Sequence, residues 1–511
     1  MEGHYSIRQR AGLFLGIPIF LIMLFSSPIG GMSREAHLTG AVAILMSIFW
    51  ITEAIPIPAT ALLPLVLFPM LKIQKASDVA ISYGDTIIYL FMGGFFIAEA
   101  MQKCNLHKRI ALFIIKRLGT EKRKIILGFM ISTAFISLWI SNTATALMML
   151  PIATAVTLSL EELDKDTIGD KVLRKSHFGK ALMLAVAYSA SIGGIGTLIG
   201  TPPNLIFAAI SKKLFPNSPS VGFAYWMIIG LPVVIIMIPI SWYYLVSFGF
   251  KVKKEKFEKG TTVIDEKIKE LGSMKLSEKL VLGIFSLTAF GWIFRENINI
   301  GSFTIPGWSN LLGINEFIHD STVAIFSAVL LFLIPVNLRK KEFLLDWETA
   351  KNIPWGILIL FGGGIALSSA FTVSGLSHWI GESLKFFSSF SPFWIIIIVS
   401  VVAILLTEVA SNTATATIFM PIMGSLAVFL KVHPHILMIP VTISVSLAFM
   451  LPVATPPNAV VFSSGYLEIS DMVKAGVILD IIGCILITAL LYFLIFPILG
   501  INPTILPEWA L

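Results

Sequence analysis

The chain carries little charge and almost no cysteine. Of its 511 residues, 13% are charged, whereas soluble globular proteins carry about 25%. Its two cysteines, Cys104 and Cys484, cannot make a disulfide framework, and the sequence has no CxxC or Cys/His metal spacing. The net charge of +7 would suggest nucleic-acid binding only if the positions of the basic residues were ignored. Those positions follow a membrane topology instead, so no nucleic-acid partner is expected.

The sequence also lacks the motifs of an intramembrane enzyme. No HExxH, GxSxG or paired aspartate motif occurs within an apolar segment. The protein is therefore not expected to be an enzyme.

What the chain has in abundance is apolar residues. They make up 56% of the sequence, the mean hydropathy is +0.87, and many runs approach the ~20 residues that span a bilayer. The first run follows "SIRQR" without a clean cleavage site and is expected to be a retained helix. We expect an all-α polytopic membrane protein with about 11 transmembrane helices. The predicted helices are 11–29, 38–52, 57–71, 86–104, 181–211 (interrupted), 223–248, 279–295, 321–336, 355–374, 437–466 (interrupted) and 471–499.

Two further apolar segments, 125–160 and 393–430, are too long for one span, at about 36 residues each. Each contains the polar hexapeptide SNTATA near its middle, at Ser141–Ala146 and at Ser411–Ala416. We expect each segment to be a re-entrant hairpin that turns at the hexapeptide. Irregular backbone at that depth is tolerated only where protein or a water-filled cavity surrounds it.

The basic residues support this topology. With the N-terminus inside, 28 lysines and arginines fall on inside segments and 8 on outside segments, as the positive-inside rule requires. The expected protein lies in the plasma (inner) membrane, with a cytoplasmic N-terminus and an outside C-terminus. The basic flank before the first hairpin belongs inside, and the nearly neutral flank before the second belongs outside, so the two hairpins are expected in opposite orientations.

The hexapeptide belongs to an internal repeat. A shift of 270 residues places the first copy on the second, and a second shared word follows, "GTPPN" at Gly200–Asn204 and "ATPPN" at Ala454–Asn458. Inverted repeats with broken helices at matching positions are typical of secondary transporters. The alternative is an old duplication kept only for helix packing.

The residue types of these words suit ions. Two prolines after a threonine favour a helix that breaks and restarts, which leaves carbonyl oxygens for a cation and N–H groups for an anion. Serine and asparagine at the hairpin tips offer hard oxygen ligands to Na⁺. No lysine or arginine occurs in 125–160, 181–211, 393–430 or 432–473. A dianion bound there would need cations bound with it, which favours at least two coupled Na⁺ ions.

Two other features have a structural and a functional interpretation. Glu408 is the only acid inside a hairpin, and Leu138 stands at the matching place in the first copy. It is either a structural carboxylate or a proton or cation site, and the second role would make the protein a cation/proton antiporter. His433 and His435 are expected in a short surface loop.

The two hexapeptides, "GTPPN", "ATPPN" and "ITEAIPIPATALLPL" make the chain resemble the divalent anion/sodium symporter family of di- and tricarboxylate and sulfate carriers. The resemblance implies a homodimer in a lipid bilayer and an elevator mechanism. It implies a transport domain of 125–248 and 393–499 and a scaffold of 30–104 and 279–374. Residues 1–29 would be an extra N-terminal helix and 249–278 a cytoplasmic linker.

The resemblance also implies the site and the function. The first Na⁺ site would use Ser137, Ser141, Asn142 and the Gly200 carbonyl, and the second Thr407, Ser411, Asn412 and the Ala454 carbonyl. The substrate would contact Asn142, Thr143, Thr201, Asn412, Thr413 and Thr455. The expected function is Na⁺-coupled symport of small divalent anions, foremost the C4-dicarboxylates succinate, malate and fumarate. The alternatives are a Na⁺-independent dicarboxylate exchanger on the same fold and a cation/proton antiporter that uses Glu408.

Overall fold

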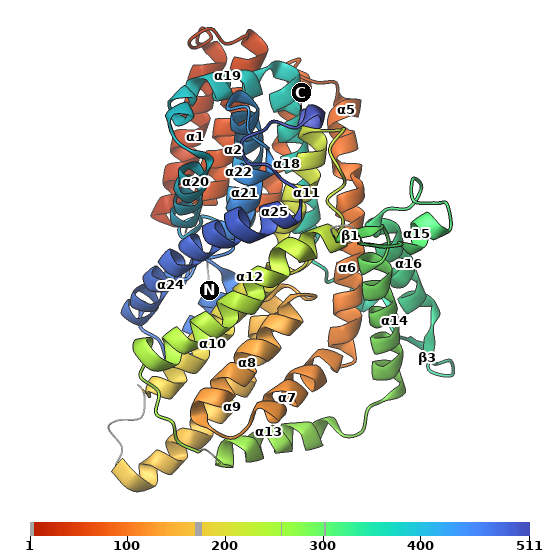
Figure 1. Cartoon of the computed structure of the whole chain (residues 1–511), viewed down its shortest axis with the longest axis vertical. Coiled ribbons are helices and arrows are strands. Elements are labelled where there is room, and N and C mark those ends of the chain that lie inside the picture. Colours follow the sequence, from red (N-terminus) through yellow and green to blue (C-terminus); the bar gives the residue numbers. More distant parts are fainter. Residues whose placement is uncertain (1–4, 169–175, 257, 301–302, 511) are drawn as a thin grey trace.

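The computed structural model describes residues 5–168, 176–256, 258–300 and 303–510. Helices dominate it (Figure 1), and two short antiparallel hairpins lie in connecting segments. Strand β1 (Ile298–Ile300) pairs with β2 (Phe303–Ile305), and β3 (Pro335–Asn337) pairs with β4 (Glu342–Phe343). Part of the predicted basic inside loop at 161–180, namely 169–175, lies outside the described residues.

The helices of the first half include two hairpin arms and a broken helix. They are α1 (Ile7–Phe25), α2 (Arg34–Thr52), α3 (Ile57–Thr60), α4 (Leu63–Met70), α5 (Ala76–Ile81), α6 (Thr86–Lys103), α7 (Leu106–Leu118), α8 (Lys122–Ser137), α9 (Asn142–Ile168), α10 (His177–Gly194), α11 (Pro202–Leu214) and α12 (Phe223–Tyr244). A π-helical turn at Leu245–Gly249 extends α12.

The second half has matching elements. Its helices are α13 (Glu258–Leu271), α14 (Leu276–Ile293), α15 (Trp308–Leu311), α16 (Asp320–Leu333), α17 (Trp347–Ala350), α18 (Trp355–Ser374), α19 (Leu376–Ser383), α20 (Pro392–Thr407), α21 (Asn412–Phe429), α22 (His435–Ser444), α23 (Pro456–Phe462), α24 (Ile469–Leu490) and α25 (Phe496–Ile498). A π-helical turn at Leu491–Ile495 follows α24, as the other one follows α12.

Within the described residues, nine helices are long and apolar enough to cross a membrane, and four apolar helices are shorter. One helix predicted from the sequence, 57–71, is divided into α3 and α4. Pro58 and Pro64 lie in the first turns of these two helices, where proline is tolerated because its missing N–H has no helical partner there. The predicted helix is therefore present as the apolar segment Ile57–Met70, with a break between α3 and α4 that was not predicted.

Both segments predicted as hairpins fold as two helices joined by a four-residue turn. The turn 138–141 joins α8 to α9, and the turn 408–411 joins α20 to α21; both first arms have 16 residues. The structure therefore confirms the helical breaks at the hexapeptides. Their re-entrant position in a bilayer stays a prediction.

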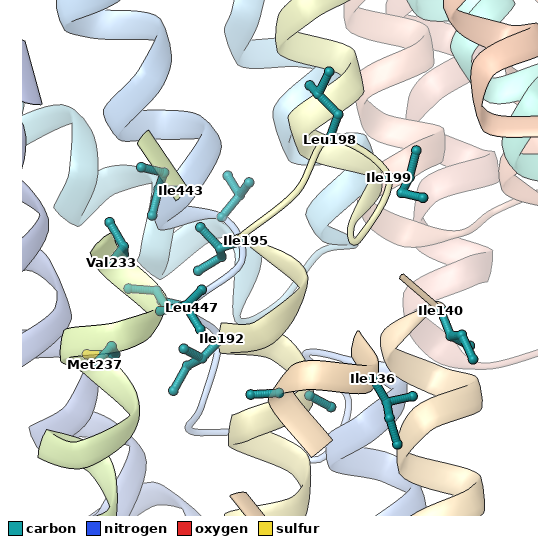
Figure 2. Packing of buried hydrophobic residues seen from close by; sticks show 14 of the residues in the cluster. Ile136, Ile140, Ile192, Ile195, Leu198, Ile199, Val233, Met237, Ile443 and Leu447 are labelled. Carbon is teal, nitrogen blue, oxygen red and sulfur yellow. The ribbon is translucent and has the colours of Figure 1, made fainter. Parts of the chain in front are cut away.

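Both predicted helix interruptions are present as well. Helix α10 ends at Gly194 and α11 begins at Pro202, while α22 ends at Ser444 and α23 begins at Pro456. Buried apolar residues from the two halves meet around these breaks. Figure 2 shows Leu447 of the second break beside Ile195 of the first break and Ile192 in the last turn of α10, with Val233 and Met237 of α12 next to them. The hydrophobic effect thus holds the two breaks together in one core.

Three packed groups surround this core. Helices α6, α14 and α16 pack side by side at one edge of the molecule (Figure 1). Helix α18 packs on α2, α3 and α4, and α1 packs on α2. The predicted linker 249–278 contains α13, which packs on α7 and α9.

The surface position predicted for His433 and His435 is wrong. Both are buried, because the ring of Trp509 from the C-terminal segment packs against them. His435 also lies 3.1 Å from both Ser211 Oγ and Tyr225 Oη. No sequence pattern indicated that the C-terminal segment would fold back over this loop.

Candidate functional site

The repeated words of the two halves meet at one cavity of about 630 Å³. Both hairpin tips and both helix breaks contribute to its lining. The predicted site residues that line it are Ser141, Asn142, Thr143, Gly200, Thr201, Ser411, Asn412, Thr413, Ala454 and Thr455. The two remaining predicted residues, Ser137 and Thr407, lie directly behind the tips and are fully buried.

The first tip gathers oxygen atoms around Asn142. Ser137 Oγ lies 2.7 Å from Asn142 Oδ1 and 2.7 Å from the carbonyl oxygen of Ala190. The same amide position of Asn142 lies 3.1 Å from the Ala190 oxygen and 3.3 Å from the Gly200 oxygen. These oxygens can be satisfied by the Asn142 amide nitrogen, when the amide is turned so that it donates to them, or by a hard cation that takes the amide oxygen as a ligand. The donor set therefore fits a hard cation, with the Ala190 carbonyl as a member that sequence reasoning missed.

The second tip repeats this geometry. Thr407 Oγ1 lies 2.7 Å from Asn412 Oδ1 and 3.1 Å from the carbonyl oxygen of Val445. The predicted partners Ser411 and Ala454 line the cavity beside it. Hydroxyl, amide and carbonyl oxygens are the ligands that hard cations prefer. Among the described residues, no group of three His, Cys, Asp or Glu side chains could hold a transition metal.

Two asparagines hold the helix breaks open. Asn204 Nδ2 donates to the carbonyl oxygens of Gly194 and Thr197 at 3.0 and 2.7 Å. Asn458 Nδ2 donates to the matching oxygens of Ala448 and Leu451 at 3.0 and 2.9 Å. Carbonyls freed by a break need such partners when they are buried. Sequence reasoning assigned no role to these two asparagines, although the repeated "TPPN" pointed to them.

Glycines bring the first break close to the first tip. A Cβ on Gly194 would lie 2.4 Å from Asn142 Oδ1, and a Cβ on Gly200 would lie 2.5 Å from the Gly194 carbonyl oxygen. Any larger residue would push the tip and the break apart. The glycine-rich run "GGIGTLIG" therefore permits the close approach on which the oxygen cluster depends.

Glu408 connects its tip to its break. Its two carboxylate oxygens accept hydrogen bonds from the backbone N–H groups of Met450 and Leu451 at 2.9 and 3.0 Å. In the first half, the Thr197 hydroxyl donates to the Leu138 carbonyl and makes the corresponding connection. The two halves therefore connect tip to break through different groups, and only the second half uses an acid. Asp480 of α24, which sequence reasoning missed, lies next to Glu408.

The remaining lining suits an anion with little fixed charge. Three long helices begin at residues of the lining, α9 at Asn142, α11 at Pro202 and α21 at Asn412. Their first N–H groups and their dipoles favour negative charge. The threonines Thr143, Thr201, Thr413 and Thr455 also line the cavity, and Thr455 caps α23 by accepting from Asn458 N at 3.3 Å.

One positively charged side chain from outside the repeat lines the cavity. Arg8 of α1 is the only lysine or arginine among the described lining residues, and Glu53 is the only acid. The absence of basic residues from the hairpins and broken helices therefore does not leave the whole cavity without a cation. Sequence reasoning missed Arg8 because it lies far from the repeated words.

Comparison with known proteins gives two kinds of similarity. The family model described as sodium:sulfate symporter transmembrane region matches residues 8–500. The chain is 42% identical over 502 residues to the sodium-dependent dicarboxylate transporter SdcS of Staphylococcus saprophyticus, covering 98% of this chain and 94% of the relative. It is also 42% identical over 499 residues to SdcS of Staphylococcus aureus (strain NCTC 8325), with 98% and 93% covered.

Two solved structures are similar in fold. The YdaH transporter of Alcanivorax borkumensis matches with a TM-score of 0.58 and 11% identity, covering 90% of this chain and 99% of that one. MtrF of Neisseria gonorrhoeae, described with a class of antimetabolite efflux pumps, matches with a TM-score of 0.54 and 11% identity, covering 93% and 97%. At this identity the similarity concerns the fold alone.

Proposed function

The chain belongs to the sodium:sulfate symporter family of membrane transporters, and from this premise we propose that it carries C4-dicarboxylates together with Na⁺. The substrates are succinate, malate and fumarate. The curated relatives named sodium-dependent dicarboxylate transporters support both the substrate class and the ion. The chain is a transporter and not an enzyme.

The observation that carries the proposal is the pair of matched oxygen clusters on one cavity. Ser137 with Asn142 and Thr407 with Asn412 have the same 2.7 Å contact. Each cluster lies behind a hairpin tip and beside a helix break. A duplication kept only for packing would not conserve two polar clusters that face the same cavity. Two clusters correspond to a minimum of two Na⁺ ions.

The order of binding follows from the charges. Helix N-termini each offer only about half a charge, and the lining has one arginine beside one glutamate. A dianion therefore binds well only after Na⁺ ions have filled the two clusters. One carboxylate of the substrate then contacts Asn142 and Thr143, and the other contacts Asn412 and Thr413. Since each asparagine serves an ion and the substrate, binding of the two is coupled.

The position of the cavity supports an elevator mechanism. Its lining combines the tips and breaks of the transport domain, 125–248 and 393–499, with Phe91, Phe95 and Leu360 of the scaffold. A site at such a boundary can move with one domain along the other. In this proposal the scaffold of 30–104 and 279–374 forms the contact of a homodimer in the plasma membrane. The N-terminus is cytoplasmic and the C-terminus is outside, and the two halves are inverted.

Two alternatives are separated from this proposal by transport assays. A Na⁺-independent exchanger would use the same fold and cavity. The antiporter is disfavoured, because both carboxylate oxygens of Glu408 accept backbone N–H groups of Met450 and Leu451, which gives this acid a structural role in holding the break.

The deciding experiment is succinate uptake into proteoliposomes that contain the purified chain. The proposal predicts uphill uptake under an inward Na⁺ gradient, and none when K⁺ replaces Na⁺. Uptake that ignores Na⁺ but requires dicarboxylate inside the vesicles would contradict the symporter and support the exchanger.

A further inference from the structure

Helix α1 lies outside the repeat and adds little to the core. Only 11% of its apolar window is buried, less than for any other spanning helix in the described part of the chain. It packs on α2. Its contribution to the stability of the core is therefore small, whereas its first turn brings Arg8 to the lining of the cavity.

The packing of α1 on α2 fixes its rotation. Gly12 and Gly16 form a GxxxG pattern, and they are the two buried residues of α1. A Cβ on Gly12 would lie 1.9 Å from Thr52 Oγ1, and a Cβ on Gly16 would lie 2.8 Å from Phe49 Cε1. Such small residues let two membrane helices approach closely. Because Arg8 precedes Gly12 by four residues, it lies on the same face of α1.

On this face, Arg8 lies near the C-terminal end of α2, where the cavity opens. Arg8 Nη2 donates to the carbonyl oxygen of Ile51, and the Tyr5 hydroxyl donates to that of Ala54. The N-terminal segment is thereby fastened to the turn after α2. The side chains of Arg8 and Glu53 are 41% and 52% exposed, so they mark the mouth of the cavity and not its floor.

The guanidinium of Arg8 has capacity for a further partner. Its closest approach to the Glu53 carboxylate is 3.8 Å, which is too long for a hydrogen bond. Exposed ion pairs of this kind are weak. A guanidinium has five N–H donors arranged to bind a carboxylate at two points, and one of them serves Ile51.

We propose that Arg8 is the cation at the cytoplasmic mouth of the cavity, where it binds one carboxylate of the dicarboxylate as the substrate passes between the hairpin tips and the cytoplasm. This inference rests on the proposed function as a dicarboxylate symporter. A cleft with apolar walls concentrates the field of a charge at its mouth and raises the local concentration of the opposite charge. Glu53 competes with the substrate for Arg8 and releases the guanidinium when a dianion arrives.

Succinate binding to the purified full-length chain, titrated by calorimetry in saturating Na⁺, tests this role. Arg8→Gln should weaken succinate binding about three- to tenfold at the ionic strength of the saturating Na⁺ salt alone, and the loss should shrink when choline chloride is added, because salt screens exposed charges. Arg8→Lys should fall between Arg8→Gln and the wild type. Glu53→Gln should bind succinate more tightly, since it frees Arg8.

Arg10→Gln is the matched control. Arg10 is an exposed arginine two residues away on the same helix, and it does not line the cavity. The inference is overturned if Arg8→Gln and Arg10→Gln bind succinate with equal affinity and equal salt dependence. It is also overturned if Glu53→Gln weakens binding as Arg8→Gln does. Should Arg8→Gln fail to fold, Arg8→Lys and Glu53→Gln still decide the question.

Failure of the proposed function would look different. In that case the wild type and Arg10→Gln would not bind succinate in a Na⁺-dependent manner at all, and the role of Arg8 would fall with it. If both bind in that manner, any change in affinity confined to the Arg8 and Glu53 variants concerns the role of Arg8 at the cavity mouth alone.

Discussion

Ser137 Oγ lies 2.7 Å from Oδ1 of Asn142, five residues further along the chain. Thr407 and Asn412 repeat this contact at the same distance in the second half. In each half the hydroxyl also reaches a backbone carbonyl of the broken helix, that of Ala190 or Val445. In each half, the corresponding atoms thus connect a hairpin tip to a helix break. An ion bound at these atoms would act on the tip and the break together.

Removing either hydroxyl should weaken Na⁺ activation of transport. Ser137→Ala or Thr407→Val should raise the Na⁺ concentration for half-maximal succinate uptake about tenfold, in line with losses of 10- to 100-fold for groups that support a metal site. The maximal rate at saturating Na⁺ should change less. Ser132→Ala is the control, because Ser132 is buried on the same helix but bonds only the Phe129 carbonyl. Equal effects of Ser132→Ala and Ser137→Ala would contradict the assignment.

The asparagines of the two breaks should be needed for stability as well as for transport. Asn204→Ala removes the amide donor from the buried carbonyls of Gly194 and Thr197. An unsatisfied buried group costs about 1–3 kcal/mol, so thermal unfolding in detergent should shift to lower temperature and uptake should fall. Asn458→Ala should behave alike. Asn204→Ala with wild-type stability and uptake would show that these bonds are dispensable.

Gly194→Ala should disturb the first tip. Its new methyl group would lie 2.4 Å from Asn142 Oδ1, so Asn142 must move away from the oxygen cluster and Na⁺ affinity should fall. Gly283→Ala is the matched control, because no atom lies within 4 Å of the added methyl group on α14. It should leave uptake unchanged. Wild-type Na⁺ activation in Gly194→Ala would contradict the close approach.

Glu408 should act by accepting backbone hydrogen bonds and not by exchanging protons. Glu408→Gln keeps an oxygen that can accept one of the two N–H groups of Met450 and Leu451, so Na⁺-driven uptake should be reduced but present. Glu408→Ala removes both bonds and should reduce uptake further. Complete loss in Glu408→Gln, with wild-type folding, would instead favour a proton or cation role for this acid.

Much of the site could be predicted from the sequence, because packing alone does not account for polar residues that are repeated within apolar runs. That pattern led to Asn142, Asn412 and the two breaks, and the structure brings them to one cavity. The carbonyls of Ala190 and Val445 were missed, because every residue has a carbonyl and only the crossing of helices shows which one is free. The helical breaks were likewise predictable from proline and glycine.

Contacts between distant segments were not predictable. Arg8 meets Glu53 only because α1 packs on α2 through two glycines. His433 is covered by Trp509, which follows it by 76 positions in the chain. Neither pairing has a local pattern, so hydrophobic periodicity and charge distribution could not reveal it.

The most direct test of the central claim is Na⁺-driven succinate uptake by Asn142→Ala and Asn412→Ala in proteoliposomes, compared with the wild type. If the two hairpin tips enclose one site, each substitution alone abolishes uphill uptake while the protein remains folded and inserted. Uphill uptake that survives in either variant at the wild-type rate and Na⁺ dependence would contradict a site shared by both tips.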